Sequence, residues 1–296
     1  MDVTPDNYPK ILLRRFEAMG DILMITPIIR KLYNDRGGKC HIDFQLYEPH
    51  KIILEHNPFV RHVLGMNEPF PCEYDMVINL DLVYEKKPKI HAVDAFSELV
   101  FGNTNFDKSL DLFTNEENKI AADQIKSMIG NDYIVLHVRN HPGTSRNINI
   151  NFWQGLVESL LSKTTVSIAF IGQQNEVCFF GNDRLIDLRH RLDILTIKEI
   201  IARAKLFVGS DTGTLHVAGT TNTDILGLFT SVRSEYRLPF RLRGKFIPIA
   251  SDIDCYGCQE QFTPPVARID CMRGDYECQN RFNPESVTEK ILSLLN

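Results

Sequence analysis

Long apolar runs are what this sequence most clearly lacks. No segment contains the roughly 18 uncharged apolar residues that a membrane-spanning helix requires. The opening residues, MDVTPDNYPK, do not show the basic stretch followed by an apolar stretch that marks a secretion leader. These absences lead us to expect a cytoplasmic protein that makes at most peripheral contact with a membrane.

Excess basic charge is also missing. Lys and Arg number 33 against 38 Asp and Glu, so the formal net charge is −5 at pH 7. Because neutralising a nucleic-acid backbone takes a broad basic face, this balance argues against nucleic acid as a partner. One local basic run remains, with five Lys and Arg residues over 233–245. It is either a solvated face or a contact for an anionic sugar or phosphate.

Low-complexity tracts and repeats at solenoid periods are absent as well, and short strands alternate with helices along the chain. The expected strands lie at 11–13, 42–47, 63–64, 76–80, 133–138, 166–171, 185–188, 206–208 and 224–229. The expected helices lie at 22–29, 51–56, 92–101, 116–129, 152–161, 196–204 and 284–295. This alternation predicts an α/β protein with mostly parallel, doubly wound sheets. A chain of 296 residues can bury two medium cores, and we expect the linker at 115–131.

The stretch 204–220 combines a strand, a polar turn and a helix. Its apolar strand ends at Gly209, and the turn leads into a helix that carries His216. A helix start leaves backbone N–H groups unpaired at the positive end of the helix dipole, which suits a phosphate. We therefore predict an anion at Thr212–Thr214. Asp211 or Thr212 acting only as a helix cap would give the same pattern.

A second turn of the same kind lies far upstream, at 11–30. Its apolar strand leads to Gly20 and Asp21, after which isoleucines recur at helical spacing. Two such units suggest two halves facing a cleft, since ligands of open parallel sheets lie beyond the carboxyl ends of the strands. The turn Thr144–Arg146, after the first strand of the second half, is either a further phosphate contact or a plain loop.

Four of the seven cysteines fall within one short segment: Cys255, Cys258, Cys271 and Cys278. A CxxC pair followed by two more cysteines suits tetrahedral binding of zinc or iron by four thiolates. Because four sulfur ligands leave no position for a substrate, we predict a structural metal. Four unrelated thiols or two disulfides are the alternatives, and a reducing cytoplasm disfavours disulfides.

Four segments, in this order, resemble glycosyltransferase family 9, the ADP-heptose heptosyltransferases of bacterial lipopolysaccharide and related surface glycans. They are MGDILMITPIIRKL with ILEHNP after it, HPGTS, the run from LDLRHRL to SDTGTLHVAG, and the cysteine tail that ends in NPESV. The GD…TP and SDTG…H pieces are the most specific, and together the segments span most of the chain. The resemblance implies a GT-B fold, in which two Rossmann-like domains face a central cleft.

The resemblance also implies roles for particular residues. Asp21 matches the family's catalytic base and Gly20 lies beside it on the acceptor side. A carboxylate there takes the proton of an acceptor hydroxyl, and it should look across a gap at the amides that hold the donor. Asp21 is also placed to cap its helix, and a buried core histidine is the alternative for His216. Donor contacts are expected from Thr144, Ser145, Arg146, Asp211, Thr212, Gly213, Thr214 and His216.

The implied reaction is inverting transfer of heptose from ADP-heptose to a hydroxyl of a lipopolysaccharide core, a related or lipid-linked glycan, or a protein. No catalytic divalent metal is expected, and the inner face of the cytoplasmic membrane is a second possible location. The expected domains are an acceptor-binding domain over 1–128 and a nucleotide-sugar-binding domain over 129–283. A terminal helix over 284–296 follows, which in such enzymes often crosses back to the first domain.

Three donor-side features depart from the family pattern. SRNININFW follows the HPG turn where members often carry Lys or Arg, Gln173 replaces a paired glycine, and Arg189 stands where glycine is usual. These departures leave two alternatives: the same chemistry with another nucleotide-sugar donor, or a catalytically inactive sugar-nucleotide-binding protein. The DxD at 252–254, a metal-binding pattern of another glycosyltransferase fold, is interpreted as incidental.

Overall fold

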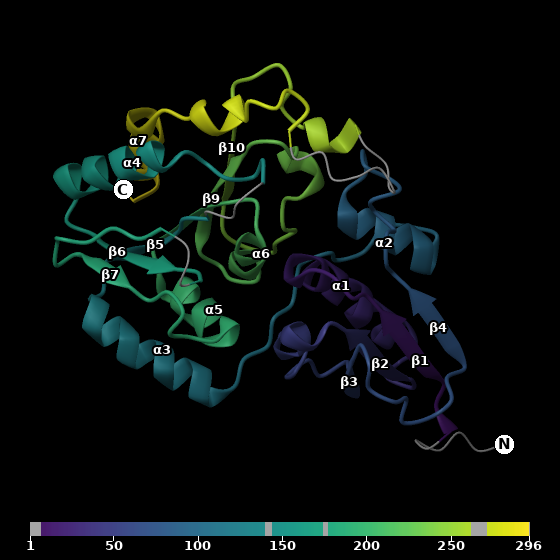
Figure 1. Ribbon diagram of the computed structural model, residues 1–296. Coiled ribbons are helices and arrows are strands. Elements are labelled where there is room, and N and C mark those ends of the chain that lie inside the picture. Colours follow the sequence, from purple (N-terminus) through teal and green to yellow (C-terminus); the bar gives the residue numbers. More distant parts are fainter. Residues whose placement is uncertain (1–6, 140–143, 174–176, 262–270, 296) are drawn as a thin grey trace.

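The computed structural model describes residues 7–139, 144–173, 177–261 and 271–295, and these form two parallel sheets (Figure 1). The first sheet has the order β3-β2-β1-β4 and contains β1 (Lys10–Arg14), β2 (His41–Leu46), β3 (His62–Gly65) and β4 (Met76–Asn79). The second has the order β10-β9-β8-β5-β6-β7 and contains β5 (Tyr133–His137), β6 (Ser167–Ile171), β7 (Leu185–Asp187), β8 (Leu206–Ser210), β9 (Asp224–Phe229) and β10 (Phe246–Ala250). The predicted mixed α/β fold with two doubly wound parts is confirmed.

The helices follow the apolar periodicity of the sequence closely. They are α1 (Met19–Asp35), α2 (Ala92–Phe101), α3 (Glu116–Ile129), α4 (Ile150–Lys163), α5 (Ile194–Arg203), α6 (Gly213–Gly219) and α7 (Pro284–Leu295). The helix expected at 51–56 is instead a short 3-10 helix, Glu48–Ile53, that begins around Pro49. The sequence analysis missed β10, since this edge strand is half exposed and contains Pro248, which weakens the strand signal.

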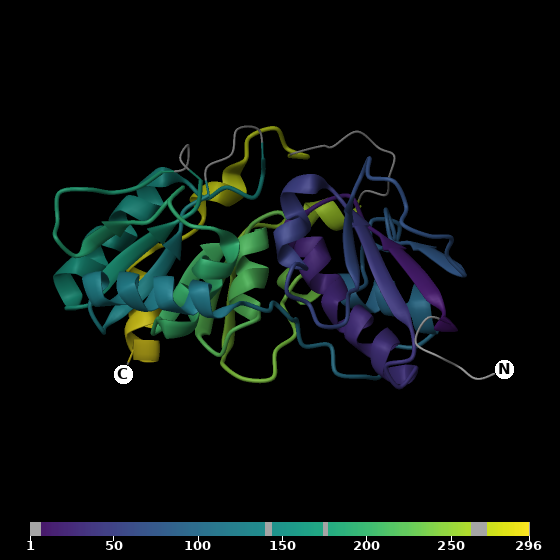
Figure 2. The ribbon, with the colours of Figure 1, turned by 90° about the horizontal axis from the view of Figure 1, so that it is seen from below.

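The expected linker, 115–131, belongs to the second half. Its helix α3 packs against α5 of the second half (Figure 2). The amide of Asn118 donates to Thr196 Oγ1 at 3.2 Å. The segment before it lies on the first half, because Arg30 donates to the carbonyl of Ser109 at 3.0 Å. A boundary at 128 would separate α3 from its packing partner, so we propose that the chain crosses between the halves within 102–115.

The terminal helix α7 does not cross back to the first half. It packs against α4 (Figure 1). Its buried Val287 and Ile291 join the apolar core around Trp153. The amphipathic pattern fixes which face of this helix is buried, but it does not say which half supplies the partner. Within the described ranges, no helix is long and apolar enough to cross a bilayer.

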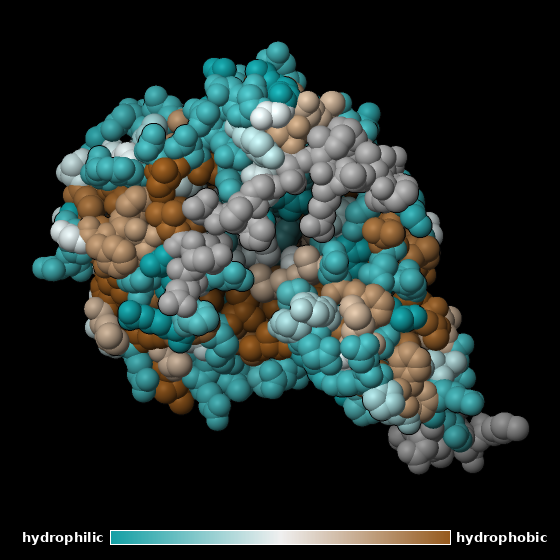
Figure 3. Space-filling model, in the orientation of Figure 1, coloured by the Kyte–Doolittle hydropathy of each residue, from teal (hydrophilic) through white to brown (hydrophobic). Residues whose placement is uncertain are grey.

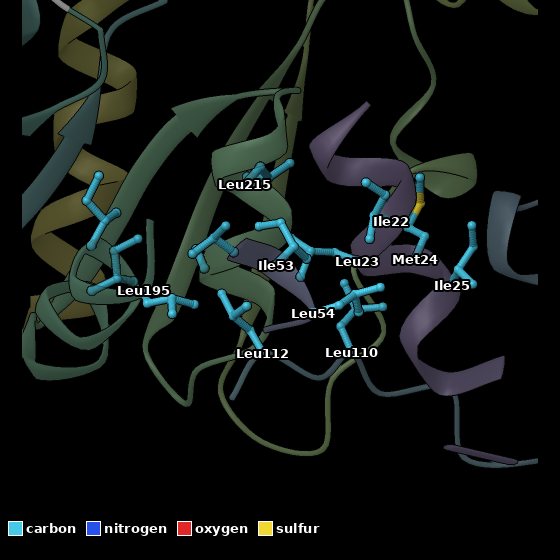
Figure 4. Packing of buried hydrophobic residues seen from close by; sticks show 14 of the residues in the cluster. Ile22, Leu23, Met24, Ile25, Ile53, Leu54, Leu110, Leu112, Leu195 and Leu215 are labelled. Carbon is cyan, nitrogen blue, oxygen red and sulfur yellow. The ribbon is translucent and has the colours of Figure 1, made fainter. Parts of the chain in front are cut away.

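A continuous apolar layer joins the two halves. Leu23 of α1, Leu54 and Leu110 come from the first half, and they share one buried cluster with Leu195 and Leu215 of the second (Figure 4). The helices α1 and α6 pack against each other across this layer. Because α1 follows β1 and α6 follows β8, this contact brings the two predicted turns to the same place.

Candidate functional site

Two glycines allow the halves to touch at this point. A Cβ atom added to Gly20 would lie 2.8 Å from His216 Cδ2 and 3.4 Å from Gly213 Cα. A Cβ added to Gly213 would lie 3.4 Å from the backbone nitrogen of Gly20. A side chain at Gly20 would press on His216 and hold the first turns of α1 and α6 apart, whereas one at Gly213 would mainly displace the flexible end of Met19. The two motifs that the sequence analysis singled out therefore form a single site.

Asp21 lies in the first turn of α1 and is only 7% exposed. Arg15 Nη2 forms an ion pair with its carboxylate, and Tyr84 Oη donates to Oδ1 at 3.2 Å. The carboxylate does not cap the helix, since the N-cap residue is Ala18. The expectation of a carboxylate facing an open gap is wrong for this arrangement, because Arg15, Tyr84 and the closed contact between the halves cover it.

Arg15 is the centre of a buried polar cluster on the first half. It also pairs with Glu85 at 2.6 Å, donates to the carbonyl of Leu80 at 3.2 Å, and lies 5.3 Å from the centre of the Tyr84 ring. Burial opposes its charge, but the Asp21 carboxylate raises the pKa of Arg15 above the ordinary value. Burial followed by the charge of Asp21 raises the pKa of Tyr84, which keeps its hydroxyl protonated as a donor.

This cluster was not predicted from the sequence. Arg15 carries a usable signal, since an arginine directly after an apolar strand and before Gly20-Asp21 is placed at the carboxyl end of the sheet. Tyr84 and Glu85 carry none, because they lie more than sixty residues away in a segment without a recognisable pattern.

On the second half, Asp211 in the turn before α6 pairs with Arg146 of the loop 144–146. These two segments together are called the donor loop below. Arg146 Nη1 lies 3.3 Å from Asp211 Oδ2, and Thr212 Oγ1 lies 3.3 Å from His137 Nδ1. Thr212 is the N-cap residue of α6, yet its side chain makes no capping hydrogen bond. Capping by the Thr212 hydroxyl therefore does not account for this turn.

The loop 144–146 is held from within the protein. Ser145 is buried, and its hydroxyl donates to Ser231 Oγ at 2.8 Å and accepts from Gln259 at 3.0 Å. Thr144 Oγ1 accepts from the backbone N–H of Arg146 at 3.2 Å. These hydroxyls maintain the loop, and Arg146 is the residue that reaches the donor side. The HPG motif at 141–143 lies outside the described residues.

Near this contact, Ser210 Oγ, His216 Nδ1 and Glu260 Oε2 are buried without a hydrogen-bond partner within the described part of the chain. Asp211 Oδ2 accepts no hydrogen bond there either, although Arg146 Nη1 lies within ion-pair distance of it. Burial lowers the pKa of His216 and raises that of Glu260, so burial favours the neutral form of both. Unpaired buried polar atoms cost stability, and native proteins tolerate them mainly where they serve a function. Other such atoms lie elsewhere, among them Trp153 Nε1 and Ser159 Oγ, but those near this contact are compatible with a ligand site.

Two arginines of the basic run at 233–245 have different roles. The Arg237 guanidinium lies 4.6 Å from the centre of the Tyr84 ring, so it sits between the halves beside the Asp21 cluster. Arg241 instead donates to the carbonyls of Thr221 and Thr223 at 2.7 and 2.6 Å, which is a structural role. From the sequence alone, the different roles of Arg237 and Arg241 could not be told apart.

A pocket of about 530 Å³ opens next to this site, between the two halves. The first half contributes Pro88 and Lys89, and the second contributes Arg233, Tyr236, Tyr256, Gly257, Glu260 and Gln261. Figure 3 shows hydrophilic residues bordering a hollow between the two parts of the molecule. Polar walls from both halves suit a hydroxyl-rich or charged ligand better than an apolar one.

The cysteine segment is close to the donor loop, and Cys278 Sγ lies 3.9 Å from the carbonyl oxygen of Ser145. Burial raises the pKa of Cys278 to about 12, and the charges of Cys255, Cys258 and Cys271 contribute. No group of three or more His, Cys, Asp or Glu side chains in the described ranges is arranged to hold a metal ion. The donor chemistry suits a thiolate-bound metal, but the geometry does not form the predicted site.

Comparison with known proteins identifies one family and several solved structures with a similar fold. No curated protein is matched by sequence. A glycosyltransferase family 9 structure from Veillonella parvula has a TM-score of 0.80 at 14% identity, with 97% of each chain covered. E. coli ADP-heptose LPS heptosyltransferase II has a TM-score of 0.71 at 15% identity and covers 97% of this chain and 98% of its own. The iron-containing dodecameric glycosyltransferase TibC of enterotoxigenic E. coli has a TM-score of 0.67 at 15% identity. The match covers 97% of this chain and 76% of the TibC chain.

These structures share the two-sheet architecture, so the expected GT-B fold is confirmed. The sequence model of glycosyltransferase family 9 (heptosyltransferase) matches residues 76–268, which is well over half of the chain. This match includes the donor loop and the first half of the cysteine segment. The chain therefore belongs to glycosyltransferase family 9.

Proposed function

We propose that this chain is an inverting glycosyltransferase that moves a heptose from ADP-heptose to a hydroxyl of a surface glycan or protein. The observation that carries the proposal is the contact of Gly20, the residue before Asp21, with Gly213 and His216. It unites an acid from the first half with a donor loop from the second. Family membership supports the reaction class, while donor and acceptor remain part of the proposal.

In the proposed reaction, Asp21 takes the proton of the acceptor hydroxyl as its oxygen attacks the anomeric carbon of the sugar. The bond from that carbon to the diphosphate oxygen breaks, and the nucleoside diphosphate leaves with the electron pair. Attack from the face opposite the leaving group inverts the anomeric centre. Arg146 and the first amides of α6 stabilise the charge that develops on the diphosphate.

The donor is proposed from chemistry shared with related folds. One TibC structure contains ADP-D-beta-D-heptose, and a structure of E. coli heptosyltransferase WaaC contains ADP. The donor loop of this chain combines Arg146 with the start of α6, a pairing that suits any nucleoside diphosphate. Because none of these contacts identifies the base or the sugar, another nucleotide-sugar donor is the nearest alternative.

Because Asp21 is buried, the acceptor cannot reach it in the arrangement described. Its carboxylate is paired with Arg15 and Tyr84 and covered by the second half, so an acceptor hydroxyl needs the halves to separate or these side chains to shift. We propose that the closed contact opens for the acceptor. The same burial favours a second candidate function, a sugar-nucleotide-binding protein without transfer activity.

For the cysteine segment we propose a structural zinc or iron ion on Cys255, Cys258, Cys271 and Cys278. The spacing of the four cysteines supports it. Because all four ligands would be sulfur, this metal would hold the segment and would not take part in transfer. Metal analysis of the purified protein tests it independently of activity.

The transfer proposal is tested with a panel of nucleotide sugars. Binding of each is measured by calorimetry, and release of the nucleoside diphosphate is then followed with candidate acceptor glycans. We expect ADP-heptose to bind and to be turned over, with Asp21→Asn retaining binding and losing turnover. Tight binding of ADP-heptose without turnover on any acceptor would favour the inactive alternative, and binding of none of the panel would contradict both.

A further inference from the structure

The cysteine segment reaches the donor loop through one side chain, Gln259. Its Oε1 accepts from Arg146 Nε at 3.3 Å and from Arg146 Nη2 at 3.2 Å. Its Nε2 donates to Ser145 Oγ at 3.0 Å, and its backbone N–H donates to the carbonyl of Ser231 at 3.0 Å. Both ends of the amide are therefore used, and both contact the same loop.

These bonds decide where the Arg146 guanidinium points. A free arginine side chain samples many rotamers, and ordering it costs conformational entropy. With Nε and Nη2 on Gln259, the remaining Nη1 faces Asp211 at 3.3 Å, beside the start of α6. The arginine is thus held in the direction in which a diphosphate would lie.

The group that accepts these hydrogen bonds from Arg146 is an amide oxygen and not a carboxylate. An amide oxygen fixes the guanidinium without cancelling its positive charge, whereas a carboxylate would both hold it and neutralise it. Arg146 has one carboxylate within ion-pair distance in the described ranges, that of Asp211. Gln259 therefore orients the guanidinium without adding a second negative charge to the one that Asp211 already supplies.

We infer that Gln259 is a positioning residue for the diphosphate site and acts through Arg146. The inference rests on the proposed function, because that proposal assigns Arg146 to the diphosphate. It gives the cysteine segment a role beyond its own folding. Gln279, next to Cys278, donates to the carbonyl of Thr144 at 2.9 Å, so the segment holds the donor loop at both ends of 144–146.

The test is a double-mutant cycle read by nucleotide affinity. Binding of ADP and of adenosine is measured by calorimetry for the unmodified protein, Gln259→Ala, Arg146→Ala and the double variant. We expect Gln259→Ala to weaken the binding of ADP about tenfold, which is the loss typical of one hydrogen bond to a charged group. The affinity for adenosine should not change. In the Arg146→Ala background, Gln259→Ala should weaken ADP by less than about twofold, because its partner is already gone.

Two further variants separate positioning from folding. Gln154→Ala removes a glutamine from the exposed face of α4, where its amide bonds only to Glu158 at 3.0 Å among the contacts described, and it should leave ADP affinity unchanged. Gln259→Glu keeps the length and the acceptor but adds a negative charge. We expect it to weaken ADP at least as much as alanine does. Thermal unfolding of each variant verifies that it folds.

Three outcomes would overturn the inference: additive losses in the cycle, an equal loss for adenosine, or ADP binding by Gln259→Ala at the level of the unmodified protein. If the unmodified protein does not bind ADP, the cycle is run with whichever of GDP, UDP or dTDP binds. If no nucleoside diphosphate binds, the proposed function fails, and this result is distinct from a failure of the Gln259 inference alone.

Discussion

Replacing Gly20 by alanine probes the contact on which the site depends. The new methyl group would lie 2.8 Å from His216 Cδ2, whereas carbon atoms in contact are separated by about 3.5 to 4.0 Å. The histidine ring or the first turn of α1 must therefore move by about 0.7 Å or more. Because His216 is buried and packed on the second half, this movement is resisted.

The size of the effect follows from two opposing terms. Inserting a methyl group into a well-packed site costs about 1 to 3 kcal/mol, while alanine in place of glycine inside a helix gains about 1 kcal/mol. We expect Gly20→Ala to lower the free energy of unfolding by about 1 kcal/mol and to lower the transfer rate. Urea unfolding and the rate of nucleotide release measure the two effects.

A second substitution isolates the clash. In a His216→Ala background the ring is absent, so Gly20→Ala should become neutral or stabilising, with a coupling of about 1 to 3 kcal/mol. Gly213→Ala is a matched comparison, because its added Cβ approaches Met19 Cε, the end of a flexible side chain, and should cost less. If Gly20→Ala alone raised stability by about 1 kcal/mol, as in a solvent-exposed helix, the described contact between α1 and α6 would be refuted.

Further predictions concern the acid, a buried histidine, the terminal helix and the cysteines. Asp21→Asn should reduce transfer about 10²- to 10⁴-fold in a nucleotide-release assay while ADP affinity changes less than twofold; near-normal transfer would remove Asp21 as the base. Burial lowers the pKa of His91 from 6.5 to about 4, so the folded protein binds fewer protons than the unfolded chain in this window. The unfolding free energy should then fall as the pH is lowered from 6.5 towards 4, by up to about 3 kcal/mol, and His91→Gln should flatten this slope in urea titrations. Ile291→Ala, at a fully buried site, should cost about 2 to 5 kcal/mol, and unchanged melting would contradict the packing of α7 on α4. Cys255→Ser should abolish zinc and iron measured by elemental analysis, whereas an unmodified protein purified without either metal would rule out the structural site.

The positions of helices and strands were largely predictable because they depend on short-range pattern. Apolar spacing predicted α2, α3 and α7 at their observed ends, and the strand β9 as well. The failures have local causes. The apolar residues of 51–56 fall partly in the 3-10 helix Glu48–Ile53, which is too short to give a clear helical period, and the edge strand β10 is half exposed and contains a proline.

The candidate site was predictable only where its residues belong to a motif. Asp21, Gly213 and His216 lie on strand-turn-helix segments whose pattern is visible in the sequence. Tyr84 and Arg237 lie in turns and Gln259 in the short 3-10 helix Cys258–Gln261, all without such a pattern. They reach the site only through long-range contacts. A loop side chain carries no periodic signal of what it will touch.

The sequence by itself determined the alternation of strands and helices, the two turns, and the family to which the chain belongs, because each depends on residues close together in the chain. Tertiary structure decided that α3 and α7 pack within the second half, that Asp21 is covered by Arg15 and Tyr84, and that the cysteine segment holds Arg146. These features depend on which surfaces meet after folding. An amphipathic helix or a buried carboxylate specifies that it needs a partner, but only the packed halves determine which partner it receives.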